Sequence, residues 1–249
     1  MPDQQPIPAA TLVIFRERET GPPELLMVER AKAMAFAGGA MVFPGGRIDG
    51  GDRLLAELHP DMPDAAARIA AIRETVEEAG VALGLSPPPS PERLGEMRAQ
   101  LHSGEAFGRV LEEAELALDL DALTPFARWL PAHRHMRIFD TLFFIARAPA
   151  GAVATVDRTE NVRLVWTGAQ AMLDEVDAGR AAAIFPTRRN LERLARFNRF
   201  EDAAADARAH PIRAVTPWVE ERDGVEHLCI PDDLGYPITS EVLTGAVRG

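Results

Sequence analysis

Short hydrophobic runs bounded by turn residues alternate along this chain with longer amphipathic stretches. The short runs, several of them rich in β-branched or aromatic residues, predict strands, and segments with Gly and Pro separate them. The predicted strands cover residues 10–16, 24–30, 40–43 and 162–166, with one more in the stretch 130–144 and a hairpin over 214–230 about Asp223-Gly224. Strands are therefore expected throughout the chain and not in one block.

Amphipathic stretches between these strands predict helices. One runs from residue 65 to residue 79 without Gly or Pro, and the charged, alanine- and leucine-bearing segment 92–118 is expected to form two more. Further helices are predicted at residues 169–177, 186–200 and 201–210. Strands and helices mixed in this order predict an α/β fold in which helices cover a sheet. We find no internal repeat or linker, which predicts a single domain over residues 1–249.

The helix at residues 65–79 has an apolar face and an acidic face. Asp64 is its predicted N-cap, and Gly80 stands at the position that commonly ends a helix. The predicted core face consists of Ile69, Ile72 and Val76. The opposite side carries Glu74, Glu77 and Glu78, and the turns before them offer only Ala66, Ala67 and Ala70. We therefore expect an open approach to the three carboxylates.

Three glutamates at this end of a helix are electrostatically unfavourable unless a cation is bound. Glu74 and Glu78 form a like-charge pair one turn apart, which costs a few tenths of a kcal/mol. The C-terminal end of a helix also carries partial negative charge. Arg73 lies one turn before Glu77, so its guanidinium can hold that carboxylate. Such a run alone is also typical of a solvated charged face, and its placement is what points to a cation site.

A second candidate element is Phe43-Pro44-Gly45-Gly46-Arg47, which follows an apolar run. A strand that ends in Pro-Gly-Gly predicts a sharp turn whose backbone approaches another group closely. A carbonyl freed from the sheet there, that of Gly46, is a candidate oxygen ligand. Mg²⁺ prefers oxygen ligands, whereas zinc calls for His or Cys. The glutamates and this carbonyl therefore predict a Mg²⁺ site.

Composition narrows the classes of partner. A net charge of −11 argues against a nucleic acid polymer, but not against a small diphosphate whose charge is met by metal. The single cysteine, Cys229, excludes a disulfide framework and most cysteine metal sites. No stretch approaches the roughly 20 apolar residues of a membrane span, and residues 1–8 show no secretory signal. We therefore expect a cytoplasmic protein that does not enter a membrane.

Pro44-Gly45-Gly46 followed by Arg73-Glu74-x-x-Glu77-Glu78-x-Gly80-Val81 resembles the Nudix box of the Nudix hydrolases. The resemblance implies an α/β/α sandwich with a mixed β-sheet. It also implies a Mg²⁺- or Mn²⁺-dependent enzyme that cleaves the diphosphate of a nucleoside diphosphate linked to another moiety. The first glutamate of the box is expected eight residues before Arg73, where Ala65 stands beside Asp64. Residues 52–63 are then an insertion within the box, residues 84–125 a helical insertion, and residues 186–249 C-terminal helices and a hairpin.

Outer motifs are similar to one branch of that family, the coenzyme A and acyl-coenzyme A diphosphatases of the peroxisomal type. The motifs are residues 25–30, Phe36-Ala-Gly-Gly39, the strand that begins at Arg137, and residues 232–237. The resemblance implies a small-molecule diphosphate substrate, with coenzyme A or acyl-coenzyme A favoured. A homodimer is compatible with the sequence.

Roles for individual residues follow from the resemblance and from phosphoryl chemistry. Glu74, Glu77, Glu78 and the Gly46 carbonyl are the expected metal ligands. Glu77, Glu78 or a loop acid would take a proton from water, and Arg73 would orient the carboxylates. The candidate substrate contacts are Arg30, Arg47, Phe36, Arg137 and Glu160. Glu160 by itself is more typical of an acid in a surface turn, and Phe36 of ordinary packing.

Other functions stay open at this point. The alternative substrates are nucleotide sugars, dinucleotides and nucleoside triphosphates, because the box does not choose the leaving group. An isomerase of isoprenoid diphosphates is expected to use a cysteine close to the box, and Cys229 is far from it. A catalytically silent nucleotide sensor is expected to lose one of the box glutamates, and all three at the helix end are present. Product analysis separates these possibilities.

Overall fold

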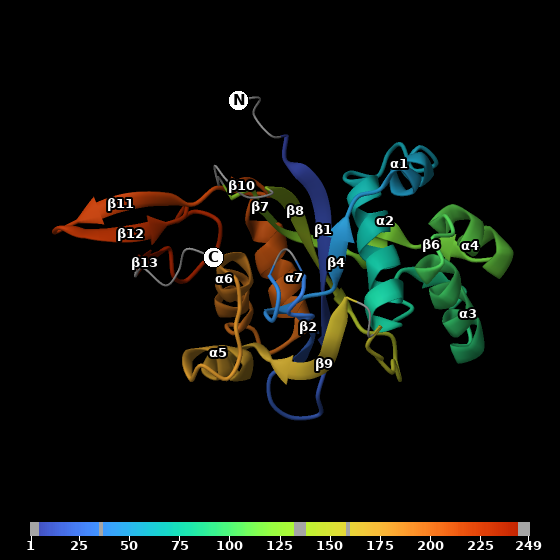
Figure 1. The fold of residues 1–249 in the computed structure, drawn as a ribbon, viewed down its shortest axis with the longest axis horizontal. Helices are drawn as coiled ribbons and strands as arrows, with labels where there is room; N and C mark the ends of the chain where they lie inside the picture. The colour runs from blue at the N-terminus through green and yellow to red at the C-terminus, as the bar shows by residue number, and fades with distance from the viewer. Residues whose placement is uncertain (1–4, 35–36, 132–137, 158–159, 244–249) are drawn as a thin grey trace.

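A mixed β-sheet runs through the middle of the computed structural model (Figure 1), which describes residues 5–34, 37–131, 138–157 and 160–243. In these residues its strand order is β10-β7-β8-β1-β2-β3, with β4 pairing with β1 and β9 with β2. The strands are β1 (Ile7–Arg16), β2 (Glu24–Arg30), β3 (Met41–Val42), β4 (Gly45–Arg47), β7 (Thr124–Trp129), β8 (Phe139–Arg147), β9 (Asn161–Gly168) and β10 (Ala214–Val215).

Two different strands, β2 and β4, pair with one edge of the central strand β1. On one side it runs parallel to β8 along its length. On the other side β2 pairs with it only at Phe15 and Arg16, and β4 pairs with it at Ala9, Ala10 and Thr11. Strands β1 and β2 therefore diverge, and the β3–β4 segment fills the gap between them. This topology places the Pro-Gly-Gly turn inside the sheet and not at its rim.

Helices cover both faces of the sheet (Figure 1). Helix α2 (Ala65–Glu74) packs on one face, and α5 (Ala169–Asp177), α6 (Phe185–Leu194) and α7 (Phe200–Ala209) pack on the other. The alternation along β1 supplies both cores, since Leu12 and Ile14 face α2 while Val13 and Phe15 face the other layer. The predicted α/β/α sandwich with a mixed sheet is confirmed.

The segment predicted as a helical insertion holds two helices, α3 (Pro91–His102) and α4 (Phe107–Ala114). A two-stranded ribbon of β5 (Leu85–Ser86) and β6 (Ala117–Leu118) brackets them, and a short 3-10 turn, η2 (Leu120–Ala122), follows. Another short helix, α1 (Gly50–Ala56), lies between β4 and α2. Figure 1 shows α3 and α4 beyond α2, at the side of the molecule away from α6 and α7.

The C-terminal segment forms a small sheet of β11 (Trp218–Arg222), β12 (Val225–Cys229) and β13 (Ser240–Val242). The β11–β12 hairpin turns at Asp223-Gly224, as predicted, and extends away from the body of the molecule (Figure 1). None of the helices in the described ranges is long and apolar enough to cross a membrane.

The helix predicted at residues 65–79 differs from the structure in three ways. It is α-helical only to Glu74 and continues as a π-helical turn, η1 (Thr75–Ala79). Asp64 is the N-cap residue, as predicted, but it has a positive φ of 56° and its side chain makes no cap hydrogen bond. Ala67 and Ala70 are buried, so the predicted open approach along the alanines is wrong. Arg68, between these alanines in sequence, donates to the Leu120 carbonyl oxygen at 2.7 Å. The core face of Ile69, Ile72 and Val76 is confirmed.

Several boundaries were also predicted wrongly. Residues 124–129 form β7, which was missed because Pro125 disfavours a strand assignment. The strand expected in 130–144 begins at Phe139, and α6 ends at Leu194, before residue 200. Helix α1 and strand β13 were not predicted.

Candidate active site

Gly45 joins the turn between β3 and β4 to the acidic helix end. It stands opposite Thr11 of β1, and a Cβ on Gly45 would lie 2.4 Å from the Ala10 carbonyl oxygen, so only glycine fits. Its N–H donates to Glu78 Oε2 at 2.9 Å. The close approach predicted from the Pro-Gly-Gly sequence is therefore an approach of this backbone to β1 and to a carboxylate.

The β1–β4 register decides which carbonyl faces the glutamates. Leu12 N–H donates to the Pro44 carbonyl and Ile48 N–H to the Pro8 carbonyl, so alternate residues of the segment face β1. Gly46, opposite Ala10, belongs to the set that faces β1. Gly45 belongs to the other set, and its carbonyl points to the same side as its N–H. The register thus favours the Gly45 carbonyl over that of Gly46 as an oxygen ligand.

Gly46 has a different part in the site. A Cβ there would lie 2.3 Å from Glu74 Oε1 and 2.5 Å from Glu74 Cδ. The Glu74 carboxylate therefore rests directly on the backbone of Gly46, in space that any side chain would fill. Each of the two glycines thus contacts the carboxylate of one glutamate, Gly45 that of Glu78 and Gly46 that of Glu74.

Arg73 organises the acids around it. Its Nε donates to Asp52 Oδ1 and its Nη2 to Asp52 Oδ2, each at 3.0 Å, while Nη1 donates to Glu74 Oε1 at 2.8 Å. Its contact with Glu77 is longer, 3.4 Å from Nη1 to Oε2, and Nη2 also donates to the Arg47 carbonyl at 2.9 Å. Burial lowers the pKa of Arg73, but Asp52 and Glu74 outweigh it and raise the pKa overall. The Arg73 guanidinium therefore keeps its positive charge.

Asp52 is held by its own helix. It sits in the first turn of α1, where its Oδ2 accepts from Asp49 N–H at 2.9 Å in a capping box. It is only 1% exposed. The resemblance led us to expect residue 52 in an insertion and the first acid of the box at residue 65. The signal was available by counting forward from the turn, since Asp52 follows Gly46 by six residues.

The π-helical turn presents Glu77 and Glu78. Its wider winding breaks the regular α-helical spacing that was predicted for the three glutamates. Gly80 ends it with φ of 61°, a left-handed conformation that favours glycine, as the C′ position predicted. Glu78 is buried at 4% exposure, whereas Glu77 is more open to solvent.

Two of the glutamates, Glu74 and Glu78, have raised pKa values. Burial, followed by the charge of Glu74, raises the pKa of Glu78 to about 8. Burial raises the pKa of Glu74 to about 7, with Glu77 and Asp52 adding to the rise and Arg73 opposing it. Buried acids that resist ionisation are typical of sites where a cation or a proton is exchanged.

Asn161 and Arg30 complete the surroundings of Glu78. They are paired across β2 and β9, and both lower the pKa of Glu78. Asn161 is fully buried; its amide lowers that pKa through a hydrogen bond to Glu78, and no further hydrogen-bond partner of the amide lies in the part of the chain that the structure describes. Arg30 Nε is likewise buried without one, and its Nη2 lies 3.6 Å from Glu160 Oε2. Polar groups without partners beside a carboxylate indicate room for a ligand.

These residues fit a divalent cation by their donor chemistry. The donors are carboxylates and a backbone carbonyl, which Mg²⁺ and Mn²⁺ prefer, and a cation would relieve the cost of ionising Glu74 and Glu78. The carboxylates do not yet converge: across the described residues no three His, Cys, Asp or Glu side chains are arranged to hold a metal ion. Arg73, Gly46 and Gly45 hold the side chains of Glu74 and Glu78 instead.

The predicted site residues are thus partly assembled. Arg73, Glu74, Glu77, Glu78 and Gly46 meet around the turn, Arg30 and Glu160 lie beside them, and Arg47 contributes its carbonyl while its side chain is exposed. Phe36 and Arg137 lie outside the described residues. Sequence reasoning missed Asp52, Asn161 and Arg98. The last donates to the carbonyls of Glu77 and Glu78, each at 2.8 Å, and nothing in the sequence of the insertion signals this.

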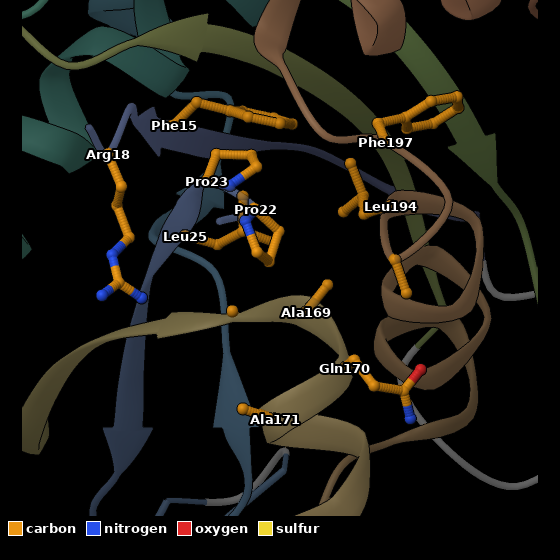
Figure 2. A pocket seen from close by; sticks show the side chains of 12 residues that line it. Phe15, Arg18, Pro22, Pro23, Leu25, Ala169, Gln170, Ala171, Leu194 and Phe197 are labelled. Carbon is orange, nitrogen blue, oxygen red and sulfur yellow. The ribbon is translucent and has the colours of Figure 1, made fainter. Parts of the chain in front are cut away.

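A separate hollow of about 570 Å³, counting space open to solvent, lies elsewhere. Figure 2 shows it between the β1–β2 turn and helices α5 and α6, with Phe15, Leu25 and Phe197 among its lining residues. These three belong to the core on the face opposite α2. No acid lines it. The hollow therefore has no part in the site around Glu78.

Known proteins resemble the chain over most of its length. A NUDIX hydrolase from Alicyclobacillus acidocaldarius is 30% identical in sequence, with a TM-score of 0.70, over 81% of this chain and 96% of that one. Acyl-coenzyme A diphosphatase NUDT19 of Homo sapiens is 25% identical over 84% of this chain and 72% of the human protein. The protein of the same name in Gallus gallus is 25% identical over 86% of this chain and 73% of its own length. No family model matches the chain.

Proposed function

This chain belongs to the Nudix hydrolases and is a pyrophosphatase of that family, and from that premise we propose that it hydrolyses the diphosphate of coenzyme A or acyl-coenzyme A with Mg²⁺ or Mn²⁺. The observation that carries the chemistry is the meeting of Glu74 and Glu78 with the glycine turn, beside the Arg73–Asp52 pair. The similarity to acyl-coenzyme A diphosphatases of two vertebrates supports the choice of substrate.

Glu74, Glu78 and the Gly45 carbonyl would hold the cation, with Glu77 sharing it. A bound Mg²⁺ or Mn²⁺ would neutralise phosphoryl charge and lower the pKa of water in the site. The chain fixes these donors in advance: Arg73 orients Glu74, and Gly45 N–H orients Glu78. Preorganised donors of this kind lower the cost of reaching the transition state.

Glu77 is the residue we assign to proton transfer. It is the least buried of the three glutamates, and within the described residues its carboxylate pairs only with Arg73, at 3.4 Å. Its carboxylate would accept a proton from the attacking water. The water oxygen bonds to one phosphorus while that phosphorus loses its bond to the bridging oxygen, giving phosphopantetheine and a nucleoside bisphosphate from coenzyme A.

Arg30 and Asn161 would contact the substrate or its bound water. Asn161 donates to Glu78, and Arg30, whose charge also acts on Glu78, has a buried Nε without a hydrogen-bond partner in the described ranges. An Arg can bind phosphate oxygens in two-point geometry, and an amide can donate or accept. Glu160, through its contact with Arg30, would set the orientation of that guanidinium.

Turnover of a substrate panel tests the proposal. The panel holds coenzyme A, acyl-coenzyme A, NADH, ADP-ribose and nucleoside triphosphates, each with and without Mg²⁺ or Mn²⁺. We expect preferential cleavage of coenzyme A or its thioesters, lost in Glu78→Gln. Cleavage of another member would keep the chemistry and reject the substrate. No cleavage of any member, with metal still bound, would reject the proposed activity.

A further inference from the structure

The helical insertion reaches the site through Arg98 of α3. Its Nε donates to the Glu77 carbonyl and its Nη2 to the Glu78 carbonyl, both at 2.8 Å. These are backbone groups of two residues whose side chains form the acidic site. We propose that Arg98 is a positioning residue, which fixes the π-helical turn so that Glu77 and Glu78 are held for the cation and the water. This inference rests on the proposed function.

Arg98 also donates hydrogen bonds to Thr155, in the segment that precedes β9. Its Nη1 donates to Thr155 Oγ1 at 2.7 Å and its Nη2 to the Thr155 carbonyl at 2.8 Å, while Thr155 N–H donates to the Ala79 carbonyl at 2.8 Å. The planar guanidinium thus joins the turn to the segment that leads to Asn161. A lysine could not do so, because its single ammonium has no fork.

The end of a helix needs such a partner. The last carbonyls of a helix accept no hydrogen bond from within the helix. They also carry partial negative charge, which here adds to the negative charge of the glutamates. Arg98 supplies a positive charge on the backbone side of the turn. It bonds the backbone carbonyls of Glu77 and Glu78 and occupies none of their carboxylate oxygens. His102, one turn further along α3, places its Nε2 3.2 Å from the same Glu77 carbonyl.

Gly80 makes room for this arrangement. A Cβ at Gly80 would lie 3.0 Å from Thr155 Oγ1 and 3.1 Å from Arg98 Nη1. The glycine is therefore required twice, once for its left-handed conformation and once because Arg98 and Thr155 occupy the space beside it.

The base of Arg98 is rigid. Its neighbours on α3, Met97 and Leu101, are buried in the same core as Ile72 and Val76. The insertion also touches the other support of the site, because Gly108 of α4 lies against the side chain of Leu55 in α1, the helix that carries Asp52. Because α3 is packed in this way, the Arg98 guanidinium has a fixed place, and its hydrogen bonds can hold the π-helical turn in a fixed place too.

Metal binding and turnover of Arg98→Ala test the inference. We expect kcat to fall by about 10- to 100-fold, the range found when groups that orient metal ligands are removed, with KM within about threefold of wild type. Mn²⁺ binding to the protein without substrate, measured by paramagnetic resonance, should weaken by about tenfold. Added guanidinium ion, below the concentrations that unfold the protein, should restore both. Arg98→Lys should be intermediate.

Arg93→Ala is the matched control on the same helix. Arg93 binds Glu96 and the Glu113 carbonyl and does not touch the π-helical turn, so kcat and the Mn²⁺ affinity should stay at wild-type values. If Arg98→Ala does not fold, Thr155→Val removes one partner of Arg98 and should shift the Mn²⁺ affinity in the same direction by a smaller factor.

An unchanged Mn²⁺ affinity in Arg98→Ala, or a loss of kcat that guanidinium does not reverse, would overturn the positioning role. The failure of the proposed function looks different. In that case the wild type cleaves no diphosphate, while the Mn²⁺ titration still decides whether Arg98 positions the glutamates.

Discussion

Arg73 and Asp52 meet through two parallel hydrogen bonds, Nε to Oδ1 and Nη2 to Oδ2, each 3.0 Å long. Asp52 comes from α1 and Arg73 from α2, and the same guanidinium donates to Glu74. The pair therefore ties the insertion side of the site to the helix that carries its glutamates. Because Asp52 is 1% exposed, water cannot replace it.

Asp52→Asn should lower both stability and activity. Removing one charge of a buried ion pair costs about 3–5 kcal/mol, because the remaining charge is left without its partner. Arg73 would then turn towards Glu74 and Glu77, and kcat should fall. Urea unfolding at neutral pH and turnover of the best substrate measure the two effects. Asp61→Asn, at an exposed acid in the same connection, is the control. Equal unfolding midpoints for the two variants would contradict the role of the pair.

Gly46→Ala should lower activity while leaving the fold intact. The new Cβ would stand 2.3 Å from Glu74 Oε1, so the carboxylate must leave its place. We expect kcat to fall by about 10- to 100-fold, as for other losses of ligand orientation. Gly51→Ala is the matched control, because a Cβ there meets nothing within 4 Å. Circular dichroism should show both variants folded. Wild-type kcat in Gly46→Ala would show that the position of Glu74 is unimportant.

The sequence predicted those features that depend on the local spacing of residues along the chain. The strands beside the core, the helix face of Ile69, Ile72 and Val76, and the glutamates could be predicted because periodicity and spacing are local properties. Asp52 could also have been found, by counting from the turn. Arg98 could not, because its partners are backbone carbonyls 20 and 21 residues away and carry no sequence signal.

The π-helical turn is a second feature that the sequence did not reveal. Its residues, Thr75–Ala79, have ordinary helical preferences, and only the contacts around them change the winding. The burial of Ala67 and Ala70 is similar, since it depends on tertiary packing around α2 and not on their spacing along the helix. The choice between the Gly45 and Gly46 carbonyls depends on the register with β1, which two consecutive glycines leave undetermined.

The metal-free protein should lose stability as the pH rises from about 5 to about 8. Burial raises the pKa of Glu74 to about 7 and that of Glu78 to about 8, from an ordinary value of 4.5. Between these values the folded state retains protons that the unfolded state has released, so stability falls as the pH increases. Glu78→Gln removes one of these groups and should be more stable than wild type at the alkaline end by more than about 1 kcal/mol.

Urea unfolding in the presence of a chelator, at several pH values, measures this dependence. The two proteins should have similar midpoints at the acidic end, where Glu78 is protonated in the folded state. A stability difference between wild type and Glu78→Gln that does not change with pH would show that Glu78 ionises normally in its buried position.

Mg²⁺ or Mn²⁺ should reverse that loss in the wild type. A cation that binds only the folded state stabilises it by about 2.7 kcal/mol at one hundred times its dissociation constant. The gain should be largest at the alkaline end, because Glu74 and Glu78 must ionise to bind it. Thermal unfolding with increasing metal measures the shift in Tm. Glu78→Gln should show a much smaller shift, and Glu175→Gln, at an exposed acid of α5 paired with Arg180, should keep the full one. Equal shifts in all three proteins would place the cation away from the glutamates and reject the assigned ligands.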